Sequence, residues 1–260
     1  MAKKSKRTAQ PRNPTSSRDI DRWLAKATQH LLQADYERVI ATAQRVLQAP
    51  VASQQHRIEA LDRLGAAYSM QQRYFEAYTV TTMLVALAPQ DAMYWYNRGI
   101  AARFTMRIGQ SLRDLERAQE LDNDSLLADR LAKDLPFARD AAEQSRVLRG
   151  PDFTLDQLIE QEELFQQAVE VMAAHRWADA ETMLRRVIAI GDVLPQPWGN
   201  LGLTLIISAA STRPRPPCVV PSRSTRTTRS PARTLSGYHT SELRANCRRC
   251  GSPVRSRARR

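Results

Sequence analysis

The chain is poor in the residues that most often build metal or disulfide sites. Among its 260 residues there are four histidines and three cysteines. All three cysteines, Cys218, Cys247 and Cys250, lie near the C-terminus. The residues before Cys218 therefore contain neither a disulfide nor a thiolate ligand. This distribution suits a reducing compartment, and we expect a cytoplasmic protein.

Long hydrophobic runs are also missing. The longest, from Leu201 to Ala210, is too short to span a bilayer. Met1 to Ser17 are basic and polar, without the apolar stretch of a signal peptide. We therefore expect no membrane segment.

Acidic residues are nearly absent from one part of the chain. Between Ile207 and Arg260 there are 13 arginines, no lysine and a single acid, Glu242. The rest of the chain carries equal numbers of basic and acidic residues, although the chain as a whole has a net charge of +12. A nucleic-acid function suggested by that charge would therefore reside in the tails.

No catalytic arrangement is recognisable. The four histidines are scattered, no glycine-rich phosphate loop occurs, and the acidic pair Glu162 and Glu163 fits a solvated helix face. Cys247 and Cys250 with Cys218 and His239 make a nominal zinc set, but structural zinc sites use more compact paired spacings. We predict no enzymatic activity, no cofactor and no metal.

What the sequence does contain is an internal repeat. One copy has large and small residues at fixed spacing: Leu61, Leu64, Gly65, Tyr68, Ala77 and Pro89. The next copy starts 34 residues after Leu61 and keeps the pattern: Trp95, Gly99, Ser111, Leu115 and Ala118. Looser copies begin at Trp23 and Leu164, and a last one opens at Trp198. Each copy predicts a helical hairpin that buries its apolar face only by stacking on its neighbours.

The steps between copies indicate one irregularity. Trp95 and Leu164 are 69 residues apart, about two periods, so we expect a degenerate helical pair within residues 125–161. Pro136 and Pro151 should bend or end its helices. Thr154 followed by Gln157 is a capping box that predicts the start of the next helix.

These spacings resemble those of the tetratricopeptide-repeat family, over roughly Ile20 to Ile206. The resemblance implies an all-α superhelix of stacked helical hairpins, whose first helices line a concave groove for a peptide or helix of another protein. We expect a basic arm at residues 1–18, the repeat domain at 19–206 with an incomplete last copy, and a disordered tail at 207–260. The lysines and asparagines with which some members bind a C-terminal carboxylate are absent.

Helical spacing along the first helices selects the residues expected in the groove. Aromatic, methionine and arginine side chains among them are favoured anchors for a partner. Each could equally pack against the next repeat. The candidates are Asp62, Met70, Tyr96, Asn97, Ile100, Arg103, Phe104, Phe165, Met172 and Asn200.

The last copy stops abruptly at Ile207, and an Arg, Ser, Pro and Thr mixture follows. Such a mixture is typical of a GC-rich gene read out of frame. With free choice of synonymous codons, a shifted reading of residues 208–235 gives QRRFDEAEAALRRALAIDPNYEIARANL, a second repeat helix and the start of another copy. Pro214 and Pro221 then give small residues and Cys218 gives Leu, Met or Val, as the motif requires. Reading the coding DNA tests this hypothesis.

We therefore predict a scaffold that binds another protein and is not an enzyme. Two alternatives remain open: a nonspecific nucleic-acid-associated protein that uses its basic tails, and a truncated repeat product without function. The partner, the pathway and the oligomeric state are not determined by the sequence.

Overall fold

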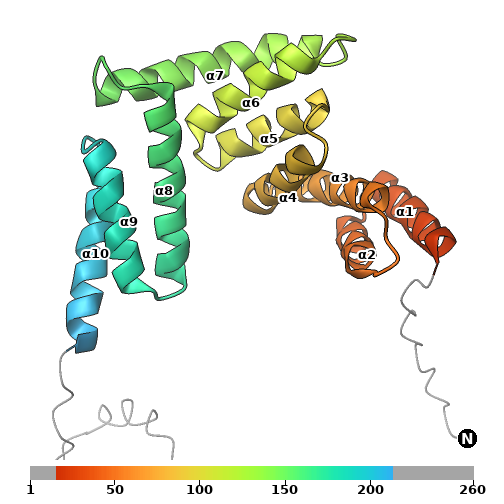
Figure 1. Cartoon of the computed structure of the whole chain (residues 1–260), viewed down its shortest axis with the longest axis horizontal. Coiled ribbons are helices and arrows are strands. Elements are labelled where there is room, and N and C mark those ends of the chain that lie inside the picture. The colour runs from red at the N-terminus through yellow and green to blue at the C-terminus, as the bar shows by residue number, and fades with distance from the viewer. Residues whose placement is uncertain (1–15, 213–260) are drawn as a thin grey trace, which may run out of the picture. The chain divides into compact units, whose positions relative to one another are not determined.

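The computed structural model describes residues 16–212, and these residues are all helical, with no strand among them. The basic arm, the cysteines, His239 and the tail beyond Thr212 lie outside the described residues. Figure 1 shows the helices in chain order. They are α1 (Ser17–Leu32), α2 (Tyr36–Gln48), α3 (Gln54–Met70), α4 (Tyr74–Leu87), α5 (Ala92–Phe104), α6 (Ile108–Leu121), α7 (Ala128–Arg149), α8 (Leu155–Ala173), α9 (Trp177–Ile190) and α10 (Pro195–Thr212).

Four pairs of helices share one turn: α1–α2, α3–α4, α5–α6 and α8–α9. Each turn holds a residue with left-handed φ, namely Ala34, Gln72, Met106 and His175, at φ of 56° to 61°. The residue after it donates its N–H to a carbonyl five residues earlier, always at 2.9 Å. The turns are 38, 34 and 69 residues apart, the same steps that separate the predicted copies.

The helix starts follow from their capping residues. Ser16 accepts the N–H of Asp19 at α1, so this helix begins two residues before the predicted boundary of the arm. Ser53 and His56 form a capping box at α3. The predicted capping box of Thr154 and Gln157 is confirmed at α8. Each side chain satisfies an N–H group that has no partner within its own helix.

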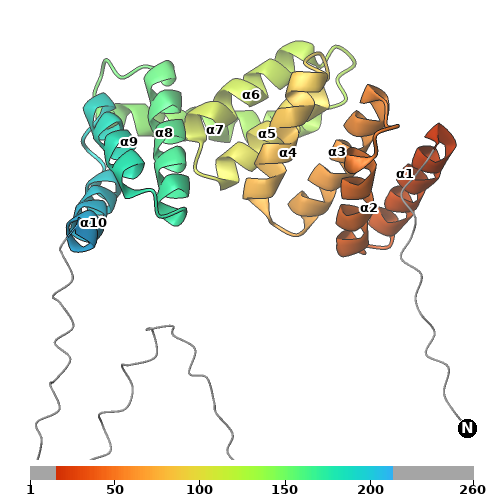
Figure 2. The same ribbon diagram turned by 60° about the horizontal axis from the view of Figure 1, so that its bottom comes forward.

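Successive helices pack against one another, as Figure 2 shows for α1 to α6. The largest core lies among α1 to α5, where Ile20, Val39, Leu64 and Leu84 are fully or almost fully buried. A smaller core joins α5, α6 and α7 around Leu115. Burial of these apolar faces supplies the main stabilisation of each pair.

The predicted helical pair within residues 125–161 is wrong. This segment forms the single helix α7 and the start of α8, and Pro136 lies inside α7 instead of ending it. A continuous apolar stripe explains why the helix persists: Leu131, Leu135, Ala138 and Ala142 are all buried. These residues recur every third or fourth position, so one face of α7 packs without interruption on both sides of the proline.

Proline has a different effect at the end of α7. The helix ends at Gly150, which has φ of 130°, and Pro151 follows in the loop. This position of Pro151 agrees with the expectation that it would end a helix.

The predicted start of disorder at Ile207 is also wrong for the first residues of the tail. Helix α10 continues through Ile207 to Thr212. No charged residue and no glycine or proline occurs between Leu203 and Thr212, so nothing in the local sequence ends the helix there.

None of the helices within residues 16–212 combines the length and apolarity that a bilayer crossing requires.

Candidate functional site

Five side chains gather where the end of α5 meets α4 and α7. We call them the Arg103 cluster: Tyr74, Arg103, Phe104, Asp134 and Phe137. Tyr74 opens α4, Arg103 and Phe104 close α5, and the other two lie one turn apart on α7. Residues three apart on a helix share a face, so α7 presents Asp134 and Phe137 together.

Arg103 is held from three directions. Its Nη1 donates to Asp134 Oδ1 at 3.0 Å. Its guanidinium lies 5.0 Å from the ring centroid of Phe104 and 5.2 Å from that of Phe137. Tyr74 stacks on Phe104, with ring centroids 4.2 Å apart and planes at 12°. Cation–π and stacking contacts therefore fix the orientation of both phenylalanine rings.

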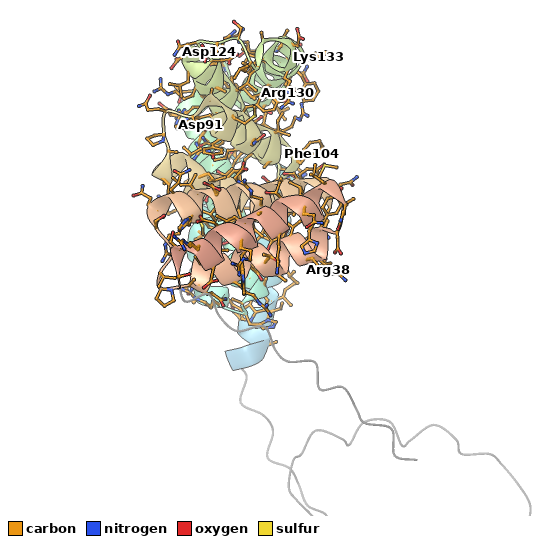
Figure 3. The ribbon with its side chains drawn as sticks, turned by 90° about the vertical axis from the view of Figure 1, so that its right-hand side faces the viewer. Arg38, Asp91, Phe104, Asp124, Arg130 and Lys133 are labelled. Carbon is orange, nitrogen blue, oxygen red and sulfur yellow. The ribbon has the colours of Figure 1, made fainter. Side chains whose placement is uncertain are left out.

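Both phenylalanines are nevertheless open to solvent. Phe104 is 48% exposed and Phe137 is 55% exposed. Figure 3 shows Phe104 on one side of the ribbon, with Arg130 and Lys133 of α7 above it and Asp91 and Asp124 on the other side. The cluster is thus a rigid apolar surface with basic side chains nearby.

Tyr96 supports this surface from inside. It is 9% exposed and donates its hydroxyl to Asp134 Oδ2 at 2.7 Å. Burial and the neighbouring Asp134 carboxylate raise the pKa of Tyr96 to about 12. The phenol therefore stays protonated at neutral pH and keeps Asp134 in place for Arg103.

A cavity of about 350 Å³ lies beyond the cluster, at the junction of α6 with α8. Its lining is mostly apolar and comes from the turn before α6 and from α7 to α10: Met106, Ile108, Leu148, Phe165, Val187, Leu194 and Pro197. Arg149, Gln161, Glu162 and Gln166 supply its polar groups. A cavity of this size and lining can take one large apolar side chain or a small apolar ligand.

Glu162 is the unusual group in this lining. Its Oε2 accepts the N–H of Gly109 at 2.9 Å, at the N-terminus of α6. Burial raises the pKa of Glu162 to about 7, although N–H groups of Gly109 and Ile108 favour its charged form. Glu162 therefore changes its protonation near neutral pH while it caps a helix of a different pair.

The structure places the predicted groove residues in three settings. Arg103 and Phe104 lie in the Arg103 cluster, with Tyr96 behind them and Ile100 packed in the same core. Phe165 lines the junction cavity and packs with Met172 against the core of α8, α9 and α10. Met70 is exposed, Asn97 and Asn200 are half-buried, and Asp62 is half-buried beside Arg63.

The structure adds residues to these settings that helical spacing did not select. Asp134 and Phe137 lie in α7, where the repeat signature is lost, so no register assigned them a face. Met106 and Leu148 line the cavity or its rim and are largely exposed. The one available signal was the left-handed turn position of Met106, which repeats that of Gln72.

Within residues 16–212, no group of three or more His, Cys, Asp or Glu side chains is arranged to hold a metal ion. Comparison of the chain with protein-family models and with curated proteins found no match.

Proposed function

We propose that the chain is a protein-binding scaffold of the tetratricopeptide type and not an enzyme. It holds an extended peptide or a helix of another protein, and the Arg103 cluster provides the main contact. The observation that carries the proposal is the pair of exposed phenylalanines, Phe104 and Phe137, fixed on either side of Arg103. Aromatic and arginine side chains that are already ordered lose little entropy on binding and are typical anchors of interfaces.

The family assignment is supported by the repeated turn. Four helix pairs share the same left-handed residue position and the same hydrogen bond, in the register predicted from the residue spacing. A stack of equivalent pairs presents equivalent faces along its length, which is how repeat proteins bind extended partners.

The charges nearby indicate the chemistry of the partner. Arg130 and Lys133 are exposed on α7, next to Asp134, which is already occupied by Arg103 and Tyr96. A segment with aromatic or large aliphatic residues next to Asp or Glu would complement this surface. One apolar side chain of such a segment would fit the junction cavity beside Phe165.

Selection of peptides from a random display library on the full chain tests this proposal. We expect the selected peptides to combine aromatic or aliphatic residues with acidic ones. Phe104→Ser should weaken their binding at least ten-fold, since it removes one fixed ring and also the stacking partner of Tyr74. The affinity is measured by isothermal titration calorimetry.

Leu32→Ser is the matched control, because Leu32 is exposed at the end of α1, far along the chain from the cluster. It should leave the affinity unchanged. The proposal fails if the selected peptides bind the Phe104→Ser and Leu32→Ser variants equally well.

A further inference from the structure

The face of α10 turned away from α9 is apolar and uncovered by any other helix within residues 16–212. Leu201 and Thr204 are buried, and Leu201 joins the core of α8 and α9. The opposite side carries large exposed side chains: Trp198, Leu203, Leu205 and Ile206. The sequence hypothesis of an incomplete last pair had expected Leu201 to be uncovered too, and that part is wrong.

Two glycines on earlier helices show what is missing at α10. Gly65 and Gly99 occupy the places in α3 and α5 that Gly202 occupies in α10, four residues after Leu61, Trp95 and Trp198. A Cβ at Gly65 would lie 3.5 Å from Val80 and 3.8 Å from Thr81 of α4. A Cβ at Gly99 would lie 3.0 Å from Leu115 and 3.2 Å from Asp114 of α6. In both pairs, the second helix passes directly over the glycine.

Gly202 has no such neighbour. A Cβ there would meet nothing within 4 Å, and the same holds for Gly199 one turn earlier. Two open glycines within a helix cost stability without any close packing in return. Trp198 otherwise repeats Trp95: the Nε1 of each donates to a carbonyl six residues earlier, at Asp192 and at Pro89. α10 thus has the features of a first helix without its second helix.

We infer that the exposed face of α10 is a docking site for one antiparallel amphipathic helix, equivalent to α4 and α6. Along this face Trp198, Gly202, Leu205 and Ala209 follow one another at every third or fourth position, so they form a continuous seam. Large apolar side chains at both ends of the seam and a glycine within it suit a partner helix that approaches closely.

The occupant must bring its own charged outer side, as α6 does with Arg113, Arg117 and Glu120. α10 has no charged residue from Pro195 to Thr212. Two copies of α10 against each other would therefore leave an apolar outer surface exposed. An amphipathic helix covers the seam and presents its polar side to water, which favours it over a second copy.

The register also specifies which residue of the occupant covers the glycine. Thr81 and Leu115 follow Gly65 and Gly99 by 16 residues. The equivalent position after Gly202 is 218, where the shifted reading frame encodes Leu, Met or Val in place of Cys218. The helix encoded in that frame, QRRFDEAEAALRRALAIDPNYEIARANL, therefore has its eleventh residue, a leucine, at this position.

The test uses the full chain and this synthetic peptide, with isothermal titration calorimetry and thermal unfolding as readouts. We expect one peptide to bind per chain and to raise the melting temperature. Gly202→Leu should weaken binding at least ten-fold, because its side chain occupies the path of the helix. It should fold normally without peptide, since the space above Gly202 is open. A peptide with aspartate as its eleventh residue should not bind.

Phe104→Ser is the matched control, and it should bind the peptide like the unchanged chain, so this inference stands or falls independently of the proposed function. Absence of binding, or equal binding to the Gly202→Leu variant, overturns the inference. Sedimentation equilibrium supplies the remaining outcome: a dimer that Gly202→Leu dissociates would make a second copy the occupant and would also overturn it.

Discussion

The contact among α1 to α5 and the contact between α6 and α8 are built from different residues. The first is apolar, with valine, leucine and alanine side chains interlocked across the repeated pairs. The second depends on polar groups: Glu162 accepts from Gly109, Arg107 donates to Glu163 at 3.0 Å, and Gln166 donates to the carbonyl of Thr105 at 3.2 Å.

The difference follows from α7. Where two equivalent pairs stack, each small residue meets a large one at the same place in every copy. Where the single helix α7 replaces a pair, α8 meets the end of a helix instead of its side. The free N–H groups of α6 then need an acceptor, and Glu162 provides one. Gln161 similarly donates to the carbonyls of Val187 and Gly191 at the end of α9.

The largest effect is expected inside a regular pair, from Asp114→Ala in α6. Asp114 is 0% exposed, and Arg98 donates to both of its carboxylate oxygens at 2.6 Å. Removal of the acid leaves Arg98 buried without its partner and should lower the free energy of unfolding by about 3–5 kcal/mol. Urea denaturation measures the loss.

The double variant Arg98→Met with Asp114→Leu is the control. It removes both charges, and it should recover most of the stability, because apolar residues of similar volume often replace a buried ion pair at little cost. A loss below about 1 kcal/mol in the Asp114→Ala variant would contradict the importance of this pair.

At the junction, Glu162 should make the stability depend on pH. Its pKa is raised from 4.5 to about 7 in the folded chain, so between these values the folded state binds more protons than the unfolded state. The stabilisation by protonation is complete below the unfolded pKa and is lost as the pH rises through about 7. Its size is at most about 3 kcal/mol. Thermal unfolding from pH 5 to pH 8 follows the change.

Glu162→Gln should flatten this dependence while keeping an oxygen that accepts the N–H of Gly109. Glu160→Gln is the control on the exposed side of α8, and it should retain the dependence of the unchanged chain. A Glu162→Gln variant with the full original dependence would assign the titration to another group.

A methyl group tests how closely the two contacts are packed. A Cβ at Gly109 would lie 2.8 Å from Ile159 and 3.2 Å from Leu158, so Gly109→Ala should push α8 from α6 and cost about 1–3 kcal/mol. Gly65→Ala meets ordinary contacts and should be neutral or stabilising by about 0.5–1 kcal/mol. Urea denaturation that shows equal effects at both positions would contradict the difference between the two contacts.

The smallest effect is expected at the turn that the regular pairs share. Gln72 has φ of 58° and is exposed. Gln72→Gly should relieve the left-handed strain and stabilise the chain by about 0.5–1 kcal/mol. Gln144→Gly, in the interior of α7, should destabilise by a similar amount. Differential scanning calorimetry resolves the two signs, and a lower melting temperature for Gln72→Gly would count against the prediction.

The regular pairs were predictable because their determinants are local. The spacing of Leu61, Gly65 and Ala77 predicts two helices and the distance between them, and the left-handed turns fall in the same register. α7 was not predictable in this way. Pro136 is a helix breaker by local rules, and only the packing of Leu131 and Leu135 against α6 overrides it.

The candidate site was predictable in part for the same reason. Helical spacing selected Arg103 and Phe104, since both lie on a helix whose face the repeat defines. Asp134 and Phe137 complete the cluster from more than 30 residues away, and no local pattern marks them. The prediction that every candidate faces one groove stays untested.

The sequence alone determined the helix pairs, their common turn and the residues available on their inner faces, because each depends on contacts within one repeat. Tertiary structure decided which of those residues are buried, as with Tyr96, and which remain open, as with Phe104. It also decided that α6 and α9 are capped by side chains of α8. These outcomes depend on how helices of different pairs meet, and the repeat spacing does not encode that arrangement once α7 interrupts it.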